Sequence, residues 1–136
     1  MTQPAYISVR DTMSPKPHSI DGLAPVSQAI QIMREHDISS LIIEKRHEGD
    51  EYGILVIHDI AEKVIGPDRA ADRVSVYEIM SKPVVTVDAE MDIKYAVRLL
   101  TRFGLSRALV MEKDELIGLV TMRDIVLRYT AAEEDT

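Results

Sequence analysis

The sequence contains no cysteine and no long apolar run. Without cysteine there is no disulfide, no thiolate nucleophile and no zinc site with cysteine ligands. No stretch approaches the ~20 apolar residues that span a bilayer, and the first residues lack the basic start and apolar run of a signal peptide. A cytoplasmic location and no membrane partner are therefore expected.

Positive charge is also scarce. The chain has 16 Lys and Arg residues against 23 Asp and Glu residues, which gives a formal net charge of -7. A negatively charged surface does not neutralise the phosphates of nucleic acid, so direct nucleic acid binding is not expected. With 46% apolar and 29% charged residues the body of the chain has an ordinary globular composition. Only residues 131–136, which carry three acidic side chains and no apolar anchor, are expected to form a disordered tail.

What the chain does contain is an internal repeat. The segment ISVRDTMS at Ile7 to Ser14 returns 67 positions later as VSVYEIMS at Val74 to Ser81. The match continues in the same register up to a loop that is two residues longer in the first copy. After this loop Asp59 of the first copy aligns with Asp124 of the second. Such a series indicates duplication of a supersecondary unit. Because each half would be marginal alone, the two copies are expected to share one core.

Each copy contains the pattern of an amphipathic helix. Apolar residues recur at i, i+3, i+4 and i+7, and the helices are expected to end near Asp37 and Gly104, the glycine in the left-handed conformation. A short extended piece precedes each helix, a hairpin follows it, and a last helix begins near His58 or Met122. The predicted order in each copy is strand, helix, strand, strand, helix. The helical positions are Val26, Ala29, Ile30 and Met33 in the first copy and Ile93, Ala96, Val97 and Leu100 in the second.

These features resemble a CBS (cystathionine beta-synthase) domain. The likeness rests on the leading V-x-x-x-M-S element, the strand and helix, and the closing G-L-V-T-M-R-D-I at Gly118 to Ile125. The tandem pair resembles a Bateman module. The resemblance implies an α/β (α+β) fold of two βαββα repeats packed about a pseudo-twofold axis. The expected division is repeat 1 at residues 7–65, a linker at 66–73 and repeat 2 at 74–130.

The resemblance also implies a function. Such modules are regulatory and sense adenosine-containing compounds, here AMP, ADP, ATP or S-adenosylmethionine, in a cleft between the repeats; no cofactor is required. No other domain is attached, so the regulated protein, which the sequence does not identify, is expected to be bound in trans. Pairing through helices into a homodimer is implied as well. The alternative is a structural dimerisation module with no physiological small ligand.

The motif Thr121 to Asp124 combines a hydroxyl and a carboxylate at a strand-to-helix junction. In one interpretation Thr121 is an N-cap and Asp124 reaches back to the cap N–H group. In the other, which the resemblance supports, Asp124 accepts hydrogen bonds from a ribose diol and Thr121 faces the ribose or phosphate. Both roles can coexist in one structure.

Arginines gather in the second copy, and two of them suit a phosphate. Arg107 opens a strand and Arg123 lies inside the helix-start motif, where guanidinium groups and free amides can bind the same anion. The resemblance further places a nucleobase against Val84, Val85 and Ala108.

The first copy departs from this pattern. It reads Val56-Ile57-His58-Asp59, with an apolar side chain in place of the hydroxyl, so His58 and Asp59 are weaker ligand candidates. His18 stands among the first-copy equivalents of the base-binding positions. The four histidines show no spacing typical of a metal site. The chain has no G-x-S-x-G, P-loop, G-x-G-x-x-G or H-E-x-x-H motif, so no catalytic residues and no enzyme activity are expected.

Overall fold

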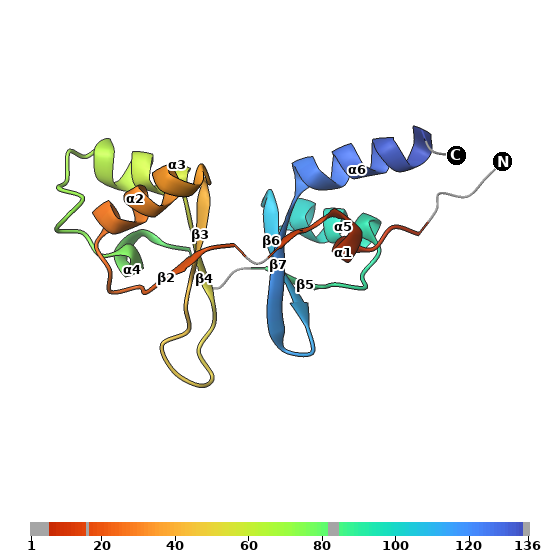
Figure 1. The fold of residues 1–136 in the computed structure, drawn as a ribbon, viewed down its shortest axis with the longest axis horizontal. Helices are drawn as coiled ribbons and strands as arrows, with labels where there is room; N and C mark the ends of the chain where they lie inside the picture. Colours follow the sequence, from red (N-terminus) through yellow and green to blue (C-terminus); the bar gives the residue numbers. More distant parts are fainter. Residues whose placement is uncertain (1–5, 16, 82–84, 135–136) are drawn as a thin grey trace. The chain divides into compact units, whose positions relative to one another are not determined.

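The computed structural model describes residues 6–15, 17–81 and 85–134, with side chains up to Tyr129. The described residues form two compact units, each with its own sheet and helices (Figure 1). The first unit consists of residues 17–81. The second unit combines residues 85–134 with residues 6–15 from the start of the chain.

The sheet of the first unit has the strand order β2-β3-β4, with β2 parallel to β3 and β3 antiparallel to β4. Its helix α2 starts after Pro25 and stops at Asp37, whose φ of 52° is left-handed. The helix after the hairpin begins as α3 and continues as the π-helix η1. The elements are β2 (Ser19–Ile20), α2 (Val26–His36), β3 (Ser40–Ile43), β4 (Gly53–Val56), α3 (Ile57–Ile60), η1 (Ala61–Ile65) and α4 (Val76–Ile79).

The sheet of the second unit has the order β1-β7-β6-β5, with only the β5–β6 pair parallel. Helix α5 is capped by Asp92, whose carboxylate accepts the N–H of Lys94 at 3.0 Å. Gly104 follows the helix with a φ of 65°, which confirms the predicted left-handed glycine. The elements are α1 (Val9–Thr12), β1 (Ser14–Pro15), β5 (Thr86–Asp88), α5 (Ile93–Arg102), β6 (Arg107–Glu112), β7 (Glu115–Thr121) and α6 (Met122–Glu134).

The predicted mixed α/β fold and the order of elements within each copy are confirmed. Two details differ. The leading motif of each copy forms a four-residue helix, α1 or α4, rather than an undefined element. Helix α6 continues to Glu134, into the segment expected to be a tail, where Ala131 and Ala132 favour helical backbone.

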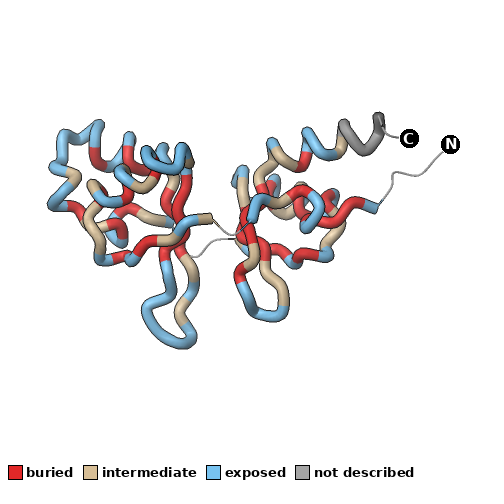
Figure 2. The backbone as a smooth tube through the Cα atoms, in the orientation of Figure 1, coloured by how far each residue is buried: buried red, intermediate tan, exposed pale blue. Residues whose placement is uncertain are grey.

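Each unit has its own cluster of buried apolar side chains (Figure 2). In the first unit Val26, Leu41 and Leu55 are fully buried, and in the second Leu100 and Val110 are. The expectation of a single shared core is therefore wrong for the described residues.

The physical reason for the separate cores is that the leading segments are exchanged between the repeats. Val9 is fully buried in the second core, whereas its counterpart Val76 is fully buried in the first. The N–H of Val9 donates to the carbonyl of Met91 at 2.8 Å, and the N–H of Val76 donates to the carbonyl of Ala24 at 2.8 Å. Each core thus contains the leading segment of the other repeat in place of its own.

Candidate functional site

The candidate site residues of the second repeat meet at one end of the β6–β7 hairpin. Arg107 lies directly opposite Thr121 in the antiparallel pair, and α6 begins at the next residue, Met122. Directly paired residues have side chains on the same face of the sheet. Because Ala108 and Val120 point into the core, the alternation of the strands places Arg107 and Thr121 on the opposite face. Both are half-buried.

The start of α6 shows the first half of the predicted capping arrangement, the bond to Thr121, but not a return bond from the Asp124 carboxylate to the cap N–H in the described residues. The Thr121 hydroxyl oxygen accepts the N–H of Asp124 at 3.1 Å, and the N–H of Met122 donates to the carbonyl of Ser106 at 2.8 Å. The carboxylate of Asp124 is half-buried and has no hydrogen bond or ion pair within the part of the chain that the structure describes. It is therefore available to accept hydrogen bonds. Arg123, the second residue of α6, is exposed.

Strand β5 provides the other border of this cluster. Val85 is partly buried against the second core, and its carbonyl accepts the N–H of Leu109 at 3.0 Å. The side chain of Ala108 is 2% exposed and belongs to that core. Only backbone atoms of Ala108 could therefore face a ligand. Val84 lies outside the described residues.

The corresponding place in the first unit has a different chemistry. Ser40 and Val56 occupy the positions of Arg107 and Thr121, so the cation is absent, the position before the helix is apolar, and the hydroxyl of the pair belongs to buried Ser40 instead. Asp59 is buried, with 9% of the residue exposed. Its carboxylate accepts the N–H of Val56 at 3.4 Å and lies 3.7 Å from Lys63 Nζ. Lys63 in turn donates to the carbonyl of Ile79 at 3.2 Å. Asp59 thus serves to connect α3 with η1 and, through Lys63, with α4.

The two candidate histidines of the first unit are both exposed. His58 Nε2 lies 2.7 Å from a carboxylate oxygen of Glu62, one helical turn later. His18 takes the place of Val85, because its carbonyl accepts the N–H of Ile42 at 3.0 Å. Its ring stacks on His36 with centroids 3.8 Å apart and an interplanar angle of 22°. No local pattern predicts this stack, because the two rings come from positions 18 residues apart.

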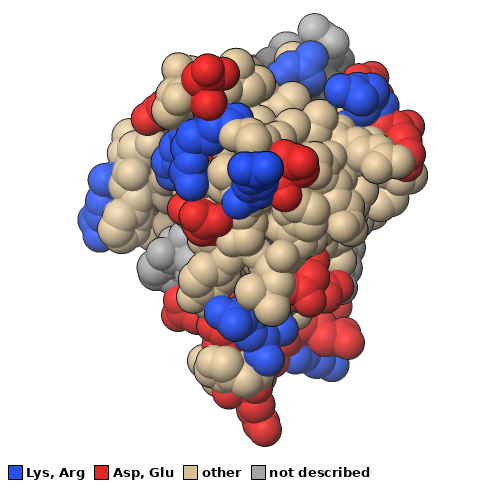
Figure 3. Space-filling view, turned by 90° about the vertical axis from the view of Figure 1, so that its left-hand side faces the viewer, with Lys and Arg blue, Asp and Glu red and all other residues tan. Residues whose placement is uncertain are grey.

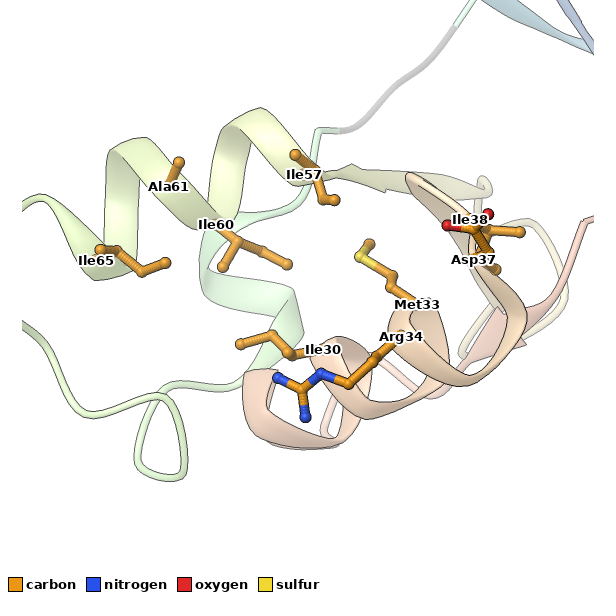
Figure 4. Close-up of a pocket in the computed structure, with 9 residues that line it drawn as sticks. All are labelled: Ile30, Met33, Arg34, Asp37, Ile38, Ile57, Ile60, Ala61 and Ile65. Atoms are coloured by element: carbon orange, nitrogen blue, oxygen red, sulfur yellow. The ribbon is translucent and has the colours of Figure 1, made fainter.

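A groove of about 400 Å³ lies among the helices of the first unit (Figure 4). Side chains of α2 form one wall and those of α3 and η1 the other. Ile57 and Ile65 remain 53% and 67% exposed at its edge. The groove was not predicted: the helical pattern of α2 includes Ile30 and Met33, but it does not show that α3 and η1 form an opposite wall. Its lining is Ile30, Met33, Arg34, Asp37, Ile38, Ile57, Ile60, Ala61 and Ile65.

The described residues contain neither a candidate metal centre nor a membrane-spanning helix. No group of three or more histidine, aspartate or glutamate side chains in residues 6–15, 17–81 and 85–134 is arranged to hold a metal ion. Within the same ranges no helix is both long and apolar enough to cross a bilayer.

Comparisons with known proteins support the repeat. The sequence model of the CBS domain matches residues 9–66 and again residues 76–130. An uncharacterised protein of Methanopyrus kandleri is 39% identical over 108 residues, which are 76% of this chain and 54% of that protein. The chain thus spans about half the length of that relative. The CBS domain-containing protein YhcV of Bacillus subtilis is 23% identical over 126 residues, 93% of this chain and 88% of that protein.

A similar solved structure is the hexameric CBS-CP12 protein from bloom-forming cyanobacteria. Its TM-score is 0.86 at 34% sequence identity, and the match covers 92% of this chain and 69% of that one.

Proposed function

Because the chain belongs to the CBS domain family, with two repeats in tandem, we propose that it senses an adenosine-containing compound and modulates a partner protein in trans. Tandem CBS domains are generally regulatory modules rather than catalysts. The ligand would be AMP, ADP, ATP or S-adenosylmethionine, and its main site would be the strand-end cluster of the second unit.

One observation carries this proposal: the aspartates at matching positions of the two repeats differ in their partners. Asp59 is bound by the Val56 N–H and Lys63, whereas the Asp124 carboxylate has no partner in the described part of the chain. A buried and paired carboxylate gains little from a ligand. A half-buried carboxylate without a partner gains charge-assisted hydrogen bonds from a ribose diol.

The neighbouring side chains fit the rest of such a ligand. Arg107 places a guanidinium group beside the N-terminus of α6, where free N–H groups and the helix dipole favour an anion. Arg123 is exposed at the same helix start and can reach a phosphate that extends from the ribose. Val84, Val85 and the backbone of Ala108 would border the base. The weaker first-unit site would use Asp59, His58 and His18.

The test is a thermal-shift titration with AMP, ADP, ATP and S-adenosylmethionine, with GTP as the control. A ligand at a hundred times its dissociation constant adds about 2.7 kcal/mol to stability, which raises the melting temperature by several degrees. We expect a saturating shift with adenosine compounds, which is lost in Asp124→Ala and retained in Thr121→Ser. A folded Asp124→Ala variant that binds as tightly as the original protein would show that the site is wrongly assigned.

A second candidate function is structural dimerisation, and the groove between α2 and α3 favours it. Apolar side chains that are more than half exposed, such as Ile57 and Ile65, gain free energy when a second copy covers them. The similar cyanobacterial protein is described as hexameric. We expect Ile65→Glu to lower the mass measured by light scattering, whereas Glu62→Gln on the same helix does not. If the protein is a monomer at micromolar concentration, this second function is excluded.

A further inference from the structure

Helix α5 carries a row of exposed positive charges. Its buried side is formed by Ile93, Ala96 and Leu100, and its sequence IKYAVRLLTR has no acidic residue. Three cations follow one another at four-residue intervals on the exposed side, and Tyr95 between them is 52% exposed. We call this surface the basic stripe; it consists of Lys94, Tyr95, Arg98 and Arg102.

The cations of the basic stripe form no ion pair in the described residues, although the Asp92 carboxylate caps the backbone N–H of Lys94. Lys94 Nζ lies 5.1 Å and Arg98 Cζ 5.6 Å from the centroid of the Tyr95 ring. No ion pair joins Lys94, Arg98 or Arg102 to an acidic side chain in residues 6–15, 17–81 or 85–129. Like charges four residues apart destabilise a helix, and a lysine in its first turn opposes the helix dipole. The helix dipole favours Arg102 in the last turn, but helix stability does not explain the repeated like charges of the whole stripe.

The first unit shows that the fold does not require the stripe. The corresponding positions on α2 are Ser27, Gln28, Gln31 and Glu35, none of them a cation. The Gln31 amide donates to the Glu35 carboxylate at 3.1 Å. On the face of the first unit seen in Figure 3, basic and acidic groups border one another. Positive charge without acidic neighbours on the helix is thus a property of α5 and not of its counterpart.

We propose that the basic stripe docks an acidic helical segment of the protein that this chain regulates. Four residues of a helix span about 6 Å, so carboxylates at i, i+4 and i+8 of a partner helix match the spacing of Lys94, Arg98 and Arg102. Tyr95 adds apolar area between the charges. The net charge of -7 opposes any polyanion, but it opposes an acidic helix with one charge per about 6 Å less than nucleic acid with one charge per roughly 1.7 Å of duplex. The proposal rests on the proposed function, because only regulation in trans requires such a partner.

The experiment is a fluorescence-anisotropy titration of the full chain with a labelled helical peptide that has glutamate at every fourth position. A peptide with glutamine at those positions and a single-stranded oligonucleotide are measured alongside. We expect the glutamate peptide to bind at low salt, more weakly as salt is added, and about tenfold more weakly to Arg98→Glu. The matched control is Gln31→Glu on α2, which places the same charge at the equivalent position and should bind as the original protein does.

Several results would overturn the proposal: no binding of the glutamate peptide at low salt, equal binding by Arg98→Glu, or tighter binding of the oligonucleotide. Loss of self-association in Arg98→Glu, measured by light scattering, would identify a second copy as the occupant instead. Arg98→Gln provides a milder variant if the reversed charge disturbs folding. The adenosine thermal shift of Arg98→Glu separates the two proposals, because it stays unchanged if only the docking surface is affected.

Discussion

At the scale of single residues, the two aspartates show how one residue type takes two roles in matching positions. Asp59 is nearly excluded from water and satisfied by two internal donors, while Asp124 is half-buried. The surroundings decide the difference. Lys63 is held near Asp59 by its own bond to the carbonyl of Ile79, which belongs to α4.

Replacement of these aspartates by alanine should therefore affect stability differently. Asp59→Ala leaves the Val56 N–H and the Lys63 ammonium without their buried partner, which costs about 1 to 3 kcal/mol. Asp124→Ala removes a carboxylate with no such partner in the described residues and should change the free energy of unfolding by no more than about 0.5 kcal/mol. Urea denaturation of the three proteins measures both values. Equal losses in the two variants would mean that Asp124 has a structural partner too.

The sequence identifies the aspartate pair but not this difference. Asp59 and Lys63 are four residues apart, and so are Asp124 and Arg128, yet of these two pairs only the first forms an ion pair. Spacing predicts which side chains can meet along a helix. It does not predict whether a second element, here α4, holds one of them in place.

At the scale of elements, α4 depends on charged contacts because it is only four residues long. The Glu78 carboxylate accepts the N–H of Ser75 at 2.8 Å and its hydroxyl at 3.2 Å, and Arg69 donates to it at 3.2 Å. These contacts, the backbone N–H first among them, hold the pKa of Glu78 below its ordinary value of 4.5. A short helix that cannot sustain itself is thus tied to its preceding loop.

The stability that Glu78 contributes should depend on pH. Because its pKa is lowered in the folded state, the contribution is fully present above the unfolded pKa and disappears as the pH falls through the folded pKa. We expect the melting temperatures of the original protein and Glu78→Gln to approach each other as the pH is lowered from about 6 to about 3, through the ordinary pKa of a glutamate. Glu48→Gln, which removes the same charge from an exposed loop, is the control. A constant difference across this range would contradict the expected role.

The hairpins contain a glycine at matching positions, Gly53 and Gly118, and the two differ in what surrounds them. A Cβ atom at Gly118 would overlap the carbonyl oxygen of Ser14 on the paired strand β1, and it would lie 2.7 Å from the Met13 sulfur. A Cβ atom at Gly53 would first meet the flexible Met80 side chain, with its sulfur at 2.7 Å. Backbone cannot move aside as a methionine can.

Gly118→Ala should therefore cost about 1 to 3 kcal/mol, and Gly53→Ala clearly less. Denaturation midpoints of the two variants, measured under the same conditions, provide the comparison. If Gly53→Ala is the more destabilising of the two, the close approach of β1 to β7 does not limit residue 118.

Local patterns predicted most of the elements. The apolar periodicity of α2 and α5, the helix ends near Asp37 and Gly104 and the left-handed glycine were predicted, because each depends on residues within a few positions, whereas the left-handed conformation of Asp37 was not predicted. The change from α3 to the π-helix η1 was not, and neither was the groove that these elements line with α2. Both depend on contacts between segments far apart in the chain.

At the scale of the whole molecule, the internal repeat in the sequence does not show that the two leading segments are exchanged. Alignment shows that Ile7 to Ser14 and Val74 to Ser81 are alike, but it does not show which half each one packs with. In the structure each belongs to the core of the other repeat. Consequently a mutation in the first repeat of the sequence can act on the second unit of the structure.

Val9 and Val76 provide a matched test of this exchange, since both are fully buried and 67 positions apart. Val→Ala at either position should cost about 2 kcal/mol from lost burial and the cavity left behind. Amide hydrogen exchange measures where that loss is felt. Val9→Ala should lower protection in β6 and β7, and Val76→Ala in β3 and β4. If instead Val9→Ala weakens β3 and β4, then the leading segment packs with its own repeat in solution.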